Sequence, residues 1–153
     1  MMKRILIVFV MIFNFLVAFS PGSTIIPIIV KESSTYAGSP SDWLKAIIWV
    51  ESGDQGKNAY NKYEPQAKGL LCQWPILVHD VNRILGYHKY SLNDRLNDKK
   101  AIEMFWIYQN YYNPEMNLEK MARIWCGGPD GHLQSCTLSY LELVKKALYD
   151  RYL

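Results

Sequence analysis

The sequence has few of the residues that build metal sites. It contains three cysteines, Cys72, Cys126 and Cys136, and three histidines scattered along its 153 residues. No two cysteines stand at the CxxC spacing that zinc sites favour. We therefore expect no bound metal ion, and no motif in the chain predicts another cofactor.

An excess of charge of one sign is also lacking. The formal net charge is +3, and without Lys3 and Arg4 the chain keeps 15 basic residues against 14 acidic ones. So balanced a chain has no basic footprint for nucleic acid, which excludes that class of partner. Repeats and low-complexity tracts are absent. Apolar residues make up 50% of the chain and charged residues 20%, which excludes a disordered chain and suits one domain with one core.

Long apolar runs are absent except at the N-terminus. There, Lys3–Arg4 precede an apolar run over residues 5–19, interrupted by Asn14, and the small residues Ala18 and Ser20 follow. This pattern predicts a signal peptide, and the run is short for a membrane span. The alternative is an uncleaved anchor, since Pro21 is a poor residue after a cleavage site. Export predicts a secreted, periplasmic or cell-envelope protein, which touches a membrane only if the segment is uncleaved.

The helix signals beyond this segment predict a mainly α domain. We expect a signal peptide over residues 1–22, a polar linker over 23–38 and the domain over 39–153. The predicted helices start at Ser39–Pro40, Pro75, Asn97, Asn117 and Thr137 or Ser139, and the first, second and fourth end at Gly53, Gly86 and Gly127–Gly128. Strand signals are weak and confined to residues 54–72, where we expect a loop or at most a small hairpin.

Glu51 is the most informative single residue. Leu44, Ile47, Ile48 and Glu51 are spaced as i, i+3, i+4 and i+7, which places the carboxylate on the apolar face of its helix. Low dielectric and the negative end of the helix dipole both favour the protonated acid there. A protonated carboxyl group is what glycoside cleavage needs near neutral pH. Taken alone, Glu51 is better explained as a solvent-facing residue at a frayed helix end.

Further motifs follow Glu51 in a recognisable order. Glu51-Ser52-Gly53 is followed by Ala67-Lys68-Gly69-Leu70-Leu71 with Pro75, and then by Trp125-Cys126-Gly127-Gly128. This series resembles the E-S-G, A-x-G-L-[LM]-Q-[IL]-x-P and W/Y-N-x-G motifs of the lytic transglycosylases, which are related to goose-type lysozymes. The resemblance covers about residues 41–149, and the combination is specific although each piece alone is weak.

The resemblance implies a lysozyme-like α+β domain with a cleft for peptidoglycan glycan strands, acting as a monomer. It implies that Glu51 protonates the β-1,4 glycosidic oxygen between N-acetylmuramic acid and N-acetylglucosamine. Lytic transglycosylases then use the same carboxylate as the base, which gives 1,6-anhydromuramyl products. A second carboxylate is therefore not required, and Asp54, Glu64 and Asp80 have no spacing that selects one of them. A lysozyme-type hydrolase stays open.

The matched motifs also imply substrate contacts, at Ser52, Cys72, Gln73, Trp125, Cys126 and Gly127. Among the tryptophans, Trp74, Trp106 and Trp125 are candidate sugar-stacking platforms, with Trp125 the best because it adjoins the Gly-Gly turn. Most of the aromatic residues between 105 and 112 are expected in the core. We expect Glu103 to be a buried structural acid, with Arg123 as its partner.

Two positions depart from the family pattern. Cys72 stands where the family has Gln, and Cys126 stands where it has Asn. A thiol is a weaker hydrogen-bond partner than an amide, so a catalytically weakened peptidoglycan-binding protein is the main alternative. A membrane-anchored interaction protein would explain neither Glu51 nor the Gly-Gly turn. The two cysteines could form a disulfide or remain two buried thiols, and Cys126–Cys136 is the rival pairing.

Overall fold

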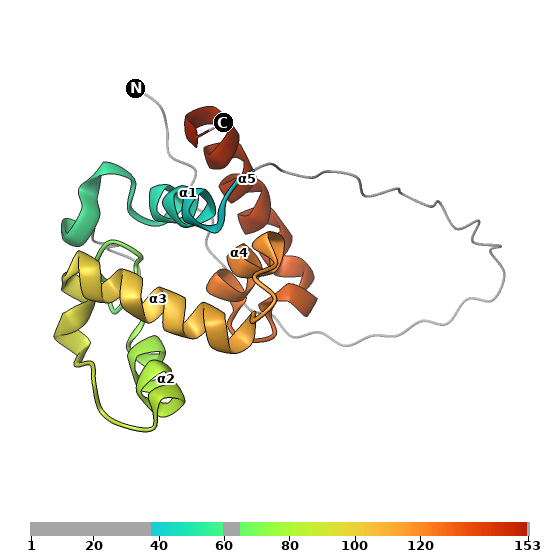
Figure 1. Cartoon of the computed structure of the whole chain (residues 1–153). Helices are drawn as coiled ribbons and strands as arrows, with labels where there is room; N and C mark the ends of the chain where they lie inside the picture. The colour runs from blue at the N-terminus through green and yellow to red at the C-terminus, as the bar shows by residue number, and fades with distance from the viewer. Residues whose placement is uncertain (1–37, 60–64, 153) are drawn as a thin grey trace, which may run out of the picture. The chain divides into compact units, whose positions relative to one another are not determined.

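The structure is a computed structural model that describes residues 38–59 and 65–152. Within this part, five α-helices follow one another: α1 (Pro40–Ser52), α2 (Pro75–Leu85), α3 (Asp98–Tyr112), α4 (Leu118–Gly127) and α5 (Leu138–Tyr152) (Figure 1). Four 3-10 helices lie between them: η1 (Gly53–Asn58), η2 (Leu92–Leu96), η3 (Gly131–Leu133) and η4 (Ser135–Thr137). The only strand-like pairing among the described residues is an isolated antiparallel bridge between Lys68 and Gln73. The prediction of a mainly α domain is confirmed.

The helix ends lie where local side-chain chemistry predicts them. Ser39 caps α1 in a capping box with Asp42, and Gly53 ends the helix with a positive φ of 57°. Gly86 ends α2 in the left-handed region, and Asn97 caps α3 through a bond from the Lys100 amide. Asn117 caps α4 in the same way, and α5 starts at Leu138, between the two starts that the sequence allowed.

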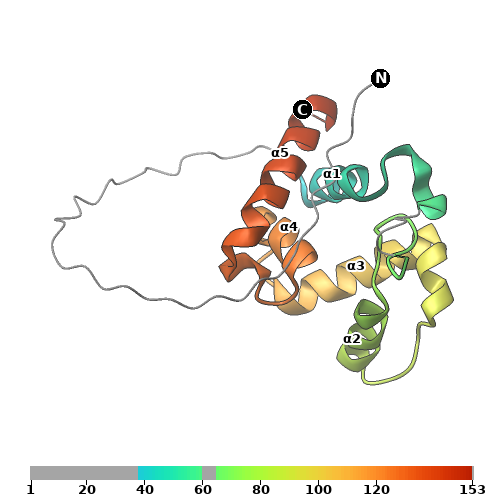
Figure 2. The same cartoon turned by 180° about the vertical axis from the view of Figure 1, so that it is seen from behind.

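Two hydrophobic clusters hold the helices together. In the larger one, buried side chains of α1 and α5 meet, among them Trp43, Ile47, Val144 and Leu148, with Phe105 of α3 beside them. Figures 1 and 2 show α1 alongside α5, and α2 against α3. The smaller cluster joins α2 to α3 and α4, through Val78, Val81, Met104, Tyr108 and Ile124. Each fully buried large apolar side chain stabilises the fold by about 1.5–3 kcal/mol.

A tight turn over residues 66–73 is fastened to η2. Arg95 is 5% exposed, and its guanidinium donates to the carbonyl oxygens of Leu92, Gln66 and Gln73 at 2.8, 2.6 and 2.8 Å. Gly69 faces the Arg95 carbonyl so closely that a Cβ atom would overlap it, and its φ is 80°. The turn is therefore held rigidly between η2 and the start of α2.

Some predictions concern residues outside the described part. The signal peptide over 1–22 and nearly all of the linker over 23–38 lie there, and so do Glu64 and the side chain of Asp54. The described residues all belong to one compact unit. None of their helices has the length and apolar character needed to cross a membrane. The substrate cleft stays a prediction.

Candidate active site

Glu51 is the penultimate residue of α1. The residues one turn and two turns before it, Ile47 and Leu44, are buried in the main core, and Glu51 itself is partly buried. The apolar face of the helix thus carries the carboxylate to the edge of the core. It also lies at the carbonyl end of the helix, next to the Gly53 cap.

Tyr140 of α5 contacts this carboxylate directly. Its hydroxyl donates a hydrogen bond to Oε1 of Glu51 at 2.6 Å, a length typical of O–H···O⁻ bonds. Burial, and then the charge of Glu51, raise the pKa of Tyr140 well above its usual value of 10.0. Tyr140 is therefore neutral at physiological pH. A phenol can donate to the ionised carboxylate and accept from the protonated acid, so it suits both states of Glu51.

Cys72 lies against the same helix end. Its thiol donates to the backbone carbonyl oxygen of Glu51 at 3.3 Å, one of the carbonyls that an α-helix leaves without an intrahelical partner. The backbone of Cys72 has a φ of 44°, which is unusual for a residue other than glycine. The turn over residues 66–73 thus positions this thiol beside Glu51.

Cys126, at the end of α4, belongs to the same neighbourhood. The residue is exposed, yet desolvation of its thiol, followed by the charges of Glu51 and Cys136, raises the thiol pKa to about 11. At neutral pH the group is a thiol, and a thiolate is the nucleophilic form. Cys126 therefore offers a weak hydrogen-bond donor, and covalent catalysis through it is disfavoured.

No disulfide joins any of the three cysteines. The predicted Cys72–Cys126 bridge and the rival Cys126–Cys136 bridge are both absent. The alternative of two buried thiols is also only half right, because Cys72 is partly buried whereas Cys126 is exposed. Cys72 nevertheless contacts Glu51, and both cysteines lie near enough to Tyr140 to influence the pKa of its hydroxyl.

Three other candidate substrate contacts have structural partners. Ser52 is buried and its hydroxyl donates to the Ile48 carbonyl at 3.1 Å. Gln73 is 1% exposed and its amide donates to the Ala101 carbonyl at 2.9 Å. At Gly127, a Cβ atom would come within 2.6 Å of the Thr137 methyl group. Gln73 and Ser52 are thus buried and donate to backbone carbonyls, and Gly127 allows α4 to pack closely.

The tryptophans rank differently from the prediction. Trp125 and Trp106 are partly buried against the main core, where Trp125 packs on Phe105 with ring centroids 4.9 Å apart. Trp74 is 42% exposed. It follows the buried Gln73 and precedes Pro75, which restricts its backbone. Trp74 is therefore the best placed of the three to stack on a ligand.

The expected pairing of Glu103 with Arg123 is wrong. The Glu103 side chain is 42% exposed and accepts a hydrogen bond from the Tyr90 hydroxyl at 2.9 Å, with Lys89 Nζ at 3.7 Å. Arg123 instead donates to Thr137 and to the Gln134 carbonyl, both at 3.0 Å. Glu103 lies in α3 and Arg123 in α4. The sequence spacing within a helix does not predict the distance between residues of two different helices.

The motifs did not point to one residue that matters at the site, Tyr140. Tyr140 shares the spacing of Val144 and Leu148 in α5, so a hydroxyl on the apolar face of that helix was the available signal. Among the described residues, no group of three or more His, Cys, Asp or Glu side chains could hold a metal ion. Comparisons with protein-family models, with curated proteins and with solved structures give no match.

Proposed function

We propose that this protein cleaves the β-1,4 bond between N-acetylmuramic acid and N-acetylglucosamine in peptidoglycan. The observation that carries the proposal is the Glu51 carboxylate at the end of an apolar helix face, with the Tyr140 hydroxyl 2.6 Å from Oε1. Cys72 and Cys126, which lie near it, stand at the two motif positions where the lytic transglycosylases have Gln and Asn. The cell envelope, where this substrate occurs, is the proposed site of action.

In the proposed reaction Glu51 acts twice. Its carboxylic acid first gives its proton to the glycosidic oxygen, and the bond from that oxygen to the muramyl anomeric carbon breaks. The carboxylate left behind then takes the proton of the muramyl 6-hydroxyl, whose oxygen attacks the same anomeric carbon. The products are a 1,6-anhydromuramyl end and a free sugar hydroxyl, and Glu51 ends protonated as it began.

The proposal needs one carboxylate, and the neighbouring chemistry agrees with that. Of the alternative acids, Asp80 accepts hydrogen bonds from Arg83 at 2.7 Å and from Tyr112 at 2.8 Å. It is thus committed to a structural network on α2 and α3. Tyr140 acts as a positioning residue, since its hydrogen bond fixes one oxygen of Glu51.

The alternative is a peptidoglycan-binding protein with weakened catalysis. It is favoured by the thiols at positions 72 and 126, because a thiol binds a sugar amide or hydroxyl more weakly than a carboxamide does. The retained Glu51 and its Tyr140 partner favour an enzyme, since binding alone needs neither a transferable proton nor a residue that orients it.

The test is mass spectrometry of muropeptides released from purified sacculi. We expect 1,6-anhydromuramyl ends with the wild type and none with Glu51→Gln, which keeps the size of the side chain and removes the transferable proton. Glu142→Gln, an exposed acid on α5 whose side chain is 68% exposed, is the matched control and retains turnover. Reducing muramyl ends would make the protein a hydrolase. No released muropeptide, with binding to sacculi intact, would support the binding protein instead.

A further inference from the structure

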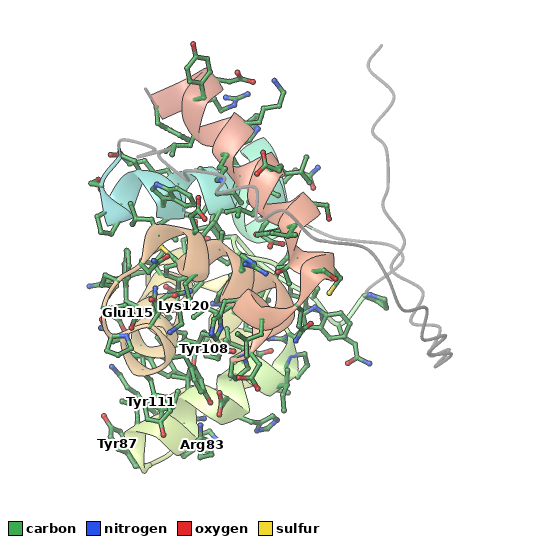
Figure 3. All side chains as sticks on the ribbon, turned by 90° about the vertical axis from the view of Figure 1, so that its right-hand side faces the viewer. Arg83, Tyr87, Tyr108, Tyr111, Glu115 and Lys120 are labelled. Atoms are coloured by element: carbon green, nitrogen blue, oxygen red, sulfur yellow. The ribbon has the colours of Figure 1, made fainter. Side chains whose placement is uncertain are left out.

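An exposed aromatic surface lies away from Glu51, where α2 and α3 meet. Tyr111, in the last turn of α3, is 52% exposed. Its ring contacts the ring of Tyr112 edge-on, with centroids 4.8 Å apart, and the Arg83 guanidinium lies 5.5 Å from its centroid. Figure 3 labels Tyr111, Arg83 and the exposed Tyr87 at the lower end of the view. An aromatic side chain thus faces solvent with fixed neighbours.

A closed hydrogen-bond network keeps these neighbours in place. Arg83 donates to Asp80 at 2.7 Å and to the Tyr112 hydroxyl at 2.7 Å, and Tyr112 donates to Asp80 at 2.8 Å. The bond to Asp80 is the main reason why the pKa of Arg83 is raised. The guanidinium cannot leave Tyr111 without breaking the bonds to Asp80 and Tyr112. The ring is therefore ordered before any ligand arrives, which lowers the entropic cost of binding.

Ring contacts continue from this surface toward the candidate active site. Tyr112 packs on Tyr108 with centroids 4.8 Å apart, and Tyr108 meets Trp125 edge-on at 6.3 Å. Trp125 directly precedes Cys126 in α4. The exposed ring is thus connected through packed side chains to the helix that borders Glu51.

The charges of this surface are compensated within it. Arg83 pairs with Asp80, and at the neighbouring start of α4 Lys120 pairs with Glu115 at 2.8 Å. These four residues therefore carry no uncompensated charge that would select an acidic or a basic peptide. An exposed aromatic face bordered by satisfied polar groups instead suits the C–H face of a neutral sugar ring.

We propose that Tyr111 is an outlying sugar-binding platform that holds the glycan strand at a distance from the bond being cleaved. The proposal rests on the proposed function, because it assigns to this surface another part of the same polymer. It predicts that affinity for long glycan strands depends on the aromatic ring of Tyr111 and is independent of the stem peptides.

The test measures binding, in the Glu51→Gln background, to purified sacculi and to peptide-free glycan strands by co-sedimentation. Adding Tyr111→Ala is expected to weaken binding to both about three- to ten-fold, the range of one aromatic contact, whereas Tyr111→Phe retains it. Tyr149→Ala, which removes a 72% exposed ring from α5, is the control and leaves affinity unchanged. Thermal unfolding of each variant checks the fold.

The outcomes separate this proposal from the proposed function. Equal affinity of the Tyr111→Ala variant and its parent would overturn the platform, even if the wild type cleaves sacculi. If binding is lost when the stem peptides are removed, the surface binds a peptide, and the proposal that it binds a sugar is overturned. A wild type that binds through Tyr111 but releases no muropeptide would uphold the platform and refute the catalytic proposal.

Discussion

Replacing Arg95 tests whether the turn beside Glu51 is held by one buried cation. The guanidinium donates to three backbone carbonyls, two of them in the turn over residues 66–73. Burial lowers the pKa of Arg95, which means that keeping this charge in the interior costs free energy. Arg95→Met keeps the length and apolar stem of the side chain and removes every donor. The Gln66 and Leu92 carbonyls then lose their guanidinium partner, while the Gln73 carbonyl keeps a bond from the Lys68 amide.

The expected cost follows from these bonds. A hydrogen bond to a charged group contributes about 1.5–3 kcal/mol, and a buried acceptor left without a partner costs about 1–3 kcal/mol. Removing the buried charge also removes its desolvation cost, which offsets part of this loss. We expect Arg95→Met to lower the free energy of unfolding by about 2–4 kcal/mol, a large part of a small domain's stability of about 5–15 kcal/mol. For a domain of this size that is a fall in Tm of roughly 8–16 °C.

Urea and thermal unfolding followed by circular dichroism measure this change. Arg83→Met is the matched control, because that side chain is 55% exposed and donates only to side chains. Its loss therefore leaves no buried backbone carbonyl without a hydrogen-bond partner. A second readout is the reactivity of the Cys72 thiol toward a disulfide reagent, which we expect to rise in Arg95→Met as the turn opens. If Arg95→Met unfolds within about 0.5 kcal/mol of the wild type, the range of ordinary surface substitutions, the turn is held by something else and our reasoning fails.

Three further outcomes are expected. With a pKa of about 11, Cys126 should react slowly with a disulfide reagent at pH 8, and faster after Glu51→Gln removes a nearby negative charge; equal rates would contradict this. Because the folded state raises the pKa of Tyr140 above 10.0, the unfolded chain releases that proton first. The free energy of unfolding should therefore be retained below about pH 10 and fall above it, less steeply in Tyr140→Phe. Gly69→Ala should prevent stable folding, since its Cβ would overlap a backbone carbonyl. Gly86→Ala has open space around it and should cost only about 1–2 kcal/mol of backbone strain. Unfolding curves of the two variants test this difference.

The helices could be predicted from the sequence because their ends are decided locally. The Ser39 capping box, Pro75, Gly86, Asn97 and Asn117 each act within one turn of the residue concerned. The polar stretch between α1 and α2 was harder to predict. Its turn is held by Arg95, which lies more than 20 residues away, so nothing within the stretch itself reveals the geometry.

Of the candidate site, the sequence identified Glu51 and the two cysteines but not the contact between Glu51 and Tyr140. These residues are 89 positions apart and meet only because α1 packs on α5. The disulfide failed for a related reason. Sequence places two oxidisable residues at one site, but whether their side chains face each other depends on the turn that gives Cys72 a φ of 44°.

The motif residues divide into those that build the site and those that can do chemistry. Gly69 and Gly127 permit close backbone packing, and Gln73 is bound inside the protein. None of these three presents a reactive group, although Gly69 and Gly127 match motif positions of the lytic transglycosylases. A substitution at any of them would abolish activity by displacing Glu51, with a loss of stability to match. A Glu51→Gln variant would lose turnover while its unfolding curve stays close to that of the wild type. Comparing both measurements in each variant therefore separates scaffold from chemistry, which loss of activity alone cannot do.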